Sequence, residues 1–174
     1  MGAAIADGPM SRLDSFIRRL QAQRACLDHA ARLVADLPGP IVEIGLGNGR
    51  TYDHLRSLFP DRPIFVFERR LEPHPSCRPP EDRLFLGDIA RTLPTALGSM
   101  RRRAALVHAD IGCGDPVVTA RNARKLARYL PAIVAAGALV VSDQPIAARW
   151  TEALPLPEGV EPGRYHLYRC KGFG

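Results

Sequence analysis

The sequence predicts an α/β fold in which a mostly parallel sheet is covered by helices on both faces. Short apolar runs alternate with longer amphipathic segments, as in βαβ units, and two short segments close the chain around a turn, as in an antiparallel hairpin. The expected strands span residues 41–44, 64–67, 83–86, 104–109 and 138–142, and the expected terminal hairpin spans 152–156 and 165–170. The expected helices span residues 11–37, 50–59, 89–100 and 116–134.

The first of these helices is amphipathic and precedes the first strand. Its apolar residues recur at three- and four-residue spacing, and Ser11 is a suitable N-cap. Pro38-Gly39-Pro40 ends the helix. We therefore expect an N-terminal helical extension over residues 1–37 and a single domain over residues 38–174.

Prolines shape three later segments. Pro94 is expected to interrupt the third helix, and Pro131 is expected to kink or end the fourth. The proline-rich loop over residues 73–80 leaves little room for a helix between the second and third strands. One face of the sheet is then left for the N-terminal helix or for a second subunit, which is the basis for expecting a homodimer.

Composition and charge exclude several classes of protein. Hydrophobic residues make up 46% of the 174 residues, a globular composition. No apolar run reaches the roughly 18 residues that span a bilayer, and no signal peptide is recognised, so we expect a cytoplasmic protein. The net charge of +6 is spread along the chain, and its densest run, residues 101–103, fits a solvated helix C-terminus. Nucleic acid is therefore not an expected partner, and four scattered cysteines argue against zinc and disulfide bonds.

A glycine turn follows the first strand. Gly45, Gly47 and Gly49 alternate with other residues there, and glycine allows tight backbone conformations and close approach of a ligand. A dinucleotide-binding turn would have the form G-x-G-x-x-G, but Arg50 stands at its last position. Glu43, on the strand itself, is unfavourable beside a pyrophosphate and suits a cofactor that carries an ammonium or sulfonium cation.

Acidic residues also follow the second and third strands, where ligands bind in open α/β sheets. Glu68 can accept hydrogen bonds from both hydroxyls of a ribose, or it can be a surface carboxylate paired with Arg69 or Arg70. Asp88 can accept a hydrogen bond from an adenine amino group, or it can cap the helix that starts at Ile89. The two functions of Asp88 are compatible.

These motifs resemble those of the class I S-adenosylmethionine-dependent methyltransferases. The matching segments are Val42–Gly49, Phe65–Glu68 and Leu86–Asp88, and together with the later strands they cover residues 38 to 170. The tail Leu154–Val160, followed by Gly163-Arg164-Tyr165, is similar to that of a small bacterial group of stand-alone members. The resemblance implies a Rossmann-like three-layer sandwich with a seven-stranded sheet whose last strand is antiparallel.

The resemblance also implies a cofactor site. Glu43 and the glycine turn would face the methionine part of S-adenosylmethionine, Glu68 the ribose and Asp88 the adenine. The residues expected to contact the cofactor are Glu43, Gly45, Leu46, Gly47, Asn48, Gly49, Thr51, Tyr52, Glu68, Gly87, Asp88, Ile89 and Asp110.

The transferred methyl group would lie near the end of the fourth strand. Asp110 is the candidate catalytic base there, whereas His108 within the strand is expected to be a packed histidine. Asp110, Asp143 and Gln144 resemble the magnesium ligands of cation-dependent O-methyltransferases, but a glutamine replaces the usual asparagine and Pro145 follows it. We therefore expect no metal site.

The function expected from the sequence is methyl transfer from S-adenosylmethionine to a small-molecule acceptor. Only a short helix precedes the core, and no substrate domain is inserted. One alternative is a regulatory module that binds the cofactor without turnover, because no catalytic base is evident. The other is a nicotinamide-dependent oxidoreductase, which Arg50 and Glu43 disfavour.

Overall fold

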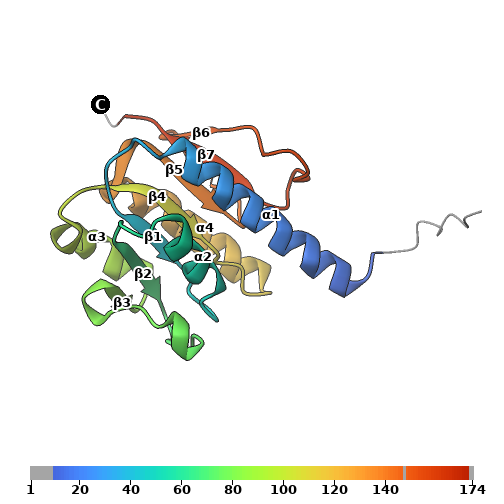
Figure 1. Ribbon diagram of the computed structural model, residues 1–174, viewed down its shortest axis with the longest axis horizontal. Helices are drawn as coiled ribbons and strands as arrows, with labels where there is room; N and C mark the ends of the chain where they lie inside the picture. Colours follow the sequence, from blue (N-terminus) through green and yellow to red (C-terminus); the bar gives the residue numbers. More distant parts are fainter. Residues whose placement is uncertain (1–9, 147, 173–174) are drawn as a thin grey trace, which may run out of the picture.

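The sheet has seven strands in the order β3-β2-β1-β4-β5-β7-β6 (Figure 1). The computed structural model describes residues 10–146 and 148–172. Strands β1 to β5 run parallel, whereas β7 is antiparallel to both β5 and β6. This confirms the predicted seven-stranded sheet with an antiparallel terminal hairpin. The strands are β1 (Ile41–Ile44), β2 (Ile64–Glu68), β3 (Leu84–Leu86), β4 (Ala104–Ala109), β5 (Val134–Ser142), β6 (Thr151–Ala153) and β7 (His166–Cys170).

Helices cover both faces of the sheet and complete a three-layer sandwich (Figure 1). Buried residues of α1 and α2 pack with one face of the sheet, and those of α3 and α4 pack with the other. The central strands β1 and β4 are buried along their whole length, as expected for parallel strands covered on both sides. The helices are α1 (Arg12–Leu33), α2 (Arg50–Leu58), α3 (Ile89–Met100) and α4 (Pro116–Tyr129).

Side chains along β1 alternate between the two layers of helices. Ile41 belongs to the core beneath α1 and α2, whereas Val42 and Ile44 belong to the core beneath α3 and α4. Because successive side chains of a strand point to opposite faces, Glu43 points toward α1 and α2. On α1, Cys26 and Leu27 are fully enclosed in the same core.

Three expected boundaries are wrong. Helix α1 ends at Leu33, and a turn follows it before the prolines. Strand β5 begins four residues earlier than expected, and β6 ends at Ala153 instead of at residue 156. Pro131 lies in a short 3-10 turn after Tyr129, so it ends α4 as the sequence suggested. Pro94 does not interrupt α3. The proline costs one helical hydrogen bond, but Leu93, Ala96 and Met100 of this helix pack in the core and offset that loss.

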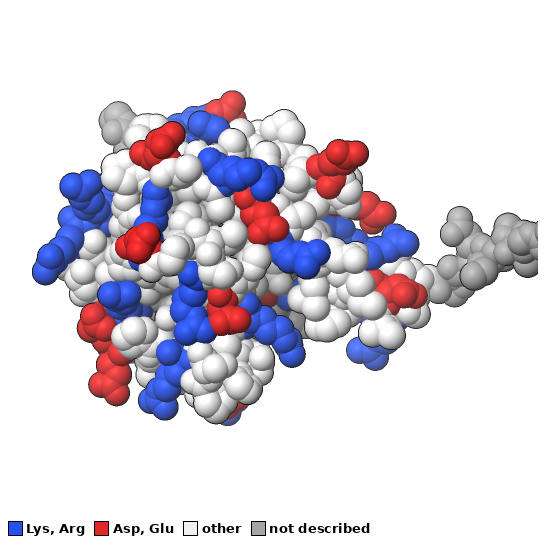
Figure 2. Space-filling model, in the orientation of Figure 1, with Lys and Arg blue, Asp and Glu red and all other residues white. Residues whose placement is uncertain are grey.

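The charged surface is mixed. Figure 2 shows lysine and arginine interspersed with aspartate and glutamate on the face in view. In the run of three arginines, Arg101 is the C-cap of α3, and Arg103 donates hydrogen bonds to the carbonyls of Pro131 and Ala132. Within residues 10–146 and 148–172, no helix is long and apolar enough to cross a membrane.

Candidate active site

A cavity of about 400 Å³ lies at the carboxyl ends of the parallel strands. It brings together eleven of the thirteen residues that the sequence assigned to the cofactor. The other two, Glu43 and Tyr52, are buried and do not line it. The eleven are Gly45, Leu46, Gly47, Asn48, Gly49, Thr51, Glu68, Gly87, Asp88, Ile89 and Asp110.

The glycine turn forms one wall of the cavity, and its three glycines have positive φ angles of 88°, 48° and 89°. A Cβ on Gly45 would lie 2.1 Å from the carbonyl oxygen of Asp110, and one on Gly49 would lie 2.4 Å from the Cβ of Cys77. These two glycines are needed for packing. Gly47 instead has no atom within 4 Å of such a Cβ, so its backbone is open to a ligand in the cavity.

Glu68 holds the glycine turn against the end of β2. One carboxylate oxygen accepts hydrogen bonds from the backbone amides of Leu46 and Gly47, at 2.6 and 3.0 Å. The other accepts from the backbone amides of Arg69 and Arg70, at 2.5 and 3.2 Å. The two arginines therefore meet Glu68 through their backbone and not through the side-chain pairing considered from the sequence.

Asp88 caps α3, as the sequence suggested, and also forms an ion pair. It accepts a hydrogen bond from the backbone amide of Ala90 at 2.9 Å, and its other oxygen lies 2.5 Å from the Nζ of Lys125. The Lys125 hydrogen bond and then that of Ala90 hold the pKa of Asp88 below its ordinary value. Asp88 is thus a carboxylate at the edge of the cavity.

A buried polar network lies beneath the cavity and joins four elements. Glu43 on β1 accepts hydrogen bonds from Thr51 at the start of α2 and, at 2.6 Å, from the Nδ1 of His108 on β4. The Nε2 of His108 lies 2.7 Å from the hydroxyl of Tyr165, which also accepts a hydrogen bond from Gln23 of α1 at 2.8 Å. His108 is fully buried and does not line the cavity, so it is the packed histidine that the sequence predicted.

The charges of this network are set by burial and by Glu43. Burial lowers the pKa of His108, but the charge and hydrogen bond of Glu43 outweigh it, and the pKa stands above its ordinary value. Burial also raises the pKa of the Tyr165 hydroxyl, which therefore stays protonated.

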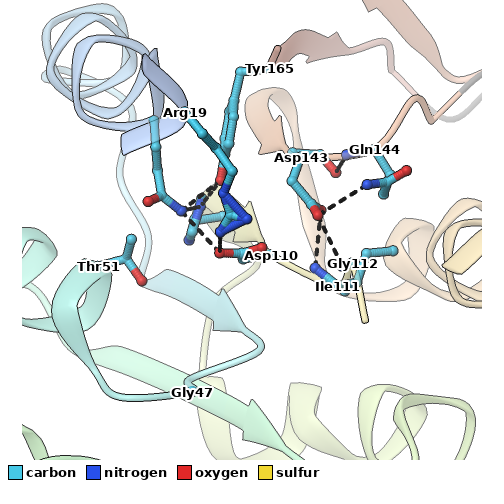
Figure 3. A network of polar contacts seen from close by, with 12 residues as sticks. Arg19, Gly47, Thr51, Asp110, Ile111, Gly112, Asp143, Gln144 and Tyr165 are labelled. Carbon is cyan, nitrogen blue, oxygen red and sulfur yellow. Dashed lines mark hydrogen bonds and ion pairs between the residues drawn. The ribbon is translucent and has the colours of Figure 1, made fainter. Parts of the chain in front are cut away.

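Two residues of α1 connect this network to the cavity through Asp110. The Nε2 of Gln23 lies 3.1 Å from an Asp110 oxygen, and the Nη2 of Arg19 donates to the same oxygen at 2.8 Å. In Figure 3, Arg19 and Tyr165 point toward Asp110 from different elements. Helix α1 therefore orients Asp110, which directly follows β4.

Asp143 holds the loop that follows β4 (Figure 3). Its two oxygens accept hydrogen bonds from the backbone amides of Ile111 and Gly112, at 3.0 and 2.9 Å, and from the side chain of Gln144 at 3.1 Å. Burial, with the charge of Asp110, raises the pKa of Asp143 despite these hydrogen bonds. In the part of the chain that the structure describes, no three His, Cys, Asp or Glu residues converge as metal ligands.

Helix α1 contributes a wall of the cavity that the sequence did not predict, with Phe16, Arg19, Leu20 and Gln23. The available signal was Gln23, a polar residue within the apolar face of an amphipathic helix. Only 4% of its surface is exposed. A buried glutamine needs partners, and here these partners lie in the site.

The order of the strands, the glycine turn and the acidic strand ends define a class I S-adenosylmethionine-dependent methyltransferase. The chain belongs to the S-adenosyl-L-methionine methyltransferase family, whose model matches residues 10–170. Its cofactor is S-adenosyl-L-methionine, and a nicotinamide-dependent oxidoreductase or a module without turnover is not favoured.

Solved structures agree with this family. An S-adenosyl-L-methionine methyltransferase from Silicibacter pomeroyi DSS-3 is 46% identical, with a TM-score of 0.84 over 92% of this chain and 99% of its own. MycE from the mycinamycin biosynthetic pathway, solved with Mg and S-adenosylhomocysteine, is 19% identical, with a TM-score of 0.51 over 79% of this chain and 35% of its own. That likeness shows the fold alone. No curated protein matches the sequence.

The buried network generates a prediction about stability. Tyr165→Phe removes the hydroxyl that both His108 and Gln23 contact, and it should lower the free energy of unfolding by about 1–3 kcal/mol. Urea denaturation measures the change. Tyr129→Phe is the control, because among the described residues its hydroxyl forms no hydrogen bond. Equal stability of the two variants would contradict a structural function for the network.

Proposed function

We propose that the cavity beneath α1 binds S-adenosylmethionine along the glycine turn and that Asp110 stands at the end where the methyl group is transferred. In this arrangement Glu68 receives the ribose hydroxyls in exchange for some of the four backbone hydrogen bonds that it accepts without a ligand, and Asp88 lies toward the adenine. The observation that supports it is the convergence of the glycine turn, Glu68, Asp88 and Asp110 on one cavity. Three carboxylates around this cavity also suit a cofactor with a sulfonium cation.

The chain's contribution to the reaction is alignment and proton transfer. The bound cofactor supplies an electrophilic methyl group, and the protein has to hold the acceptor in line with it. Arg19 and Gln23 fix one carboxylate oxygen of Asp110 for this. Among the described residues the other oxygen accepts no side-chain hydrogen bond, so it can accept a proton from the acceptor. Phe16 and Leu20 of α1 give the same space an apolar wall.

A small-molecule acceptor fits this space best. The cavity of about 400 Å³ is the size of a site for one small ligand, the cofactor. Residues of α1 line it, so only a small acceptor can approach the methyl group beside that helix. The fold is compatible with such an acceptor, since MycE has also been solved with mycinamycin VI bound, at a TM-score of 0.51 and 20% identity. The mixed charges in Figure 2 give no support to a nucleic-acid acceptor.

The ribose function of Glu68 is tested by substitution. Glu68→Ala should weaken the binding of S-adenosylhomocysteine by about 1–3 kcal/mol, because two hydroxyls would lose their acceptor and the glycine turn would lose its anchor. Isothermal titration calorimetry measures the loss. Glu72→Ala is the matched control, since among the described residues this exposed carboxylate pairs only with Arg70. Unchanged affinity in the Glu68 variant would remove this residue from the cofactor site.

Methyl transfer is tested with labelled cofactor offered to a metabolite extract. The wild-type chain should incorporate label into small-molecule fractions, and Asp110→Asn should slow incorporation about 100-fold or more if a base is required. The exposed Asp36→Asn should react at the wild-type rate. Binding of S-adenosylhomocysteine without incorporation into any fraction would contradict a small-molecule acceptor. An undiminished rate with Asp110→Asn would contradict its catalytic function.

The homodimer expected from the sequence is supported by exposed apolar residues on α1. Leu13 and Ile17 are 66% and 43% exposed, and burying them against a second copy would be favourable. Sedimentation equilibrium should therefore give about twice the monomer mass of 19.1 kDa. A single species of monomer mass at micromolar concentration would contradict the dimer. The cytoplasmic location and the division into a helical extension, residues 1–37, and a methyltransferase domain, residues 38–174, stay predictions.

A further inference from the structure

A second hollow lies beside the cofactor cavity, between α1 and the turn that precedes β7. Its volume is about 370 Å³, and it shares the side chains of Phe16 and Arg19 with the first cavity. The two spaces therefore meet at these two side chains. The second hollow is lined by Arg12, Ser15, Phe16, Arg19, Gly163 and Arg164.

The walls of this hollow are positively charged. Three of its six lining residues are arginines, and none is acidic. Arg164 is held toward α1 by a hydrogen bond from its Nη1 to the hydroxyl of Ser15, at 3.3 Å. Two acids outside the hollow pair with its arginines: Asp110 lies 2.8 Å from Arg19, and Glu161, which is 59% exposed, is shared between Arg164 and Arg18. Glu161 therefore screens Arg164 only weakly, and Arg12 has no ion pair among the described residues.

Arg19 lies at the boundary between the two spaces, and not all of its N–H groups have a hydrogen-bond acceptor among the described residues. Its Nη2 donates to Asp110 at 2.8 Å. Its Nε is buried and, among the residues that the structure describes, has no hydrogen-bond partner. A buried N–H group without an acceptor is unfavourable, and an acceptor oxygen from a ligand at this boundary would satisfy it.

We propose that this second hollow binds an anionic group of the methyl acceptor, a carboxylate or a phosphate. The proposal rests on the proposed function, since it concerns the acceptor of the same site. Guanidinium groups present a planar fork of donors that matches both anions. Arg12 supplies such a group from α1, and Arg164 supplies one from the turn before β7. Phe16 lies between the hollow and the cofactor cavity, so the apolar part of the acceptor packs on its ring and reaches toward Asp110.

The test uses three probes that share one aromatic ring: benzoate, phenyl phosphate and the neutral benzamide. Each is titrated into the full chain saturated with S-adenosylhomocysteine, and binding is followed by NMR shifts. At least one of the two anions should bind saturably, and about tenfold more tightly than benzamide, because a charged hydrogen bond to arginine is lost with the amide. The anion that binds identifies the group as carboxylate or phosphate.

Three arginine variants locate the binding. Arg12→Met and Arg164→Met should each weaken the binding of the preferred anion about tenfold, while leaving the affinity for S-adenosylhomocysteine unchanged. Arg24→Met removes the same charge from an exposed position of the same helix outside the hollow and should have no effect. Arg12 is exposed at the start of α1, so its substitution leaves the fold intact even if the Arg164 variant is unstable.

Three results would overturn the proposal: no saturable binding of either anion, equal binding of benzamide, or equal losses with Arg24→Met and Arg12→Met. These results are independent of turnover. Methyl incorporation without anion binding would refute the anionic subsite and leave the proposed function intact. Anion binding that is lost in Arg12→Met, without any methyl incorporation by the wild-type chain, would support the anionic subsite and contradict the proposed function.

Discussion

The arrangement of the site depends on one buried pair, Glu43 and His108. The two residues are register partners on the neighbouring central strands β1 and β4, and both are fully buried. Such a pair contributes little net stability, because the loss of hydration offsets the attraction. Its consequence is geometric, since each remaining polar atom of the pair needs a partner. Thr51, Tyr165 and, through Tyr165, Gln23 fill these positions, and they bring α2, the segment before β7 and α1 to the same place.

This requirement connects the core of the sheet to the chemistry at its edge. Gln23 contacts Tyr165 within the network and Asp110 at the cavity, and Arg19, one helical turn earlier, contacts the same carboxylate. Helix α1 is thus both a layer of the fold and a wall of the site. The second hollow lies along the same helix, so the cofactor cavity and the proposed anion site share one structural support.

Local sequence patterns were sufficient to predict the sheet and most of the cavity. The glycine turn and the acidic residues at strand ends are fixed by the chain near them, and Glu68 and Asp88 lie where these patterns placed them. The position of Glu43 follows from the alternation of side chains along β1, which turns it toward α1 and α2 and away from the cavity. That alternation was visible in the sequence, but the elements covering the face were not.

The contribution of α1 could not be predicted, because periodicity shows which face of a helix is apolar and not what that face covers. Gln23 and Arg19 obtain their function from residues more than 80 positions away, on β4 and beside it. The start of β5 was mispredicted for a related reason. Pro131 ends α4, and β5 starts as early as Val134 because this residue pairs with Ala104 of β4.

The most direct test of this account is a crystal structure of the chain with S-adenosylhomocysteine. The account predicts the ligand in the cavity beneath α1, with both ribose hydroxyls within hydrogen-bonding distance of Glu68 and the sulfur directed toward Asp110. The adenine should lie on the side of Asp88 and Ile89. A ligand bound outside this cavity, or one inside it whose ribose lies away from Glu68, would contradict the account.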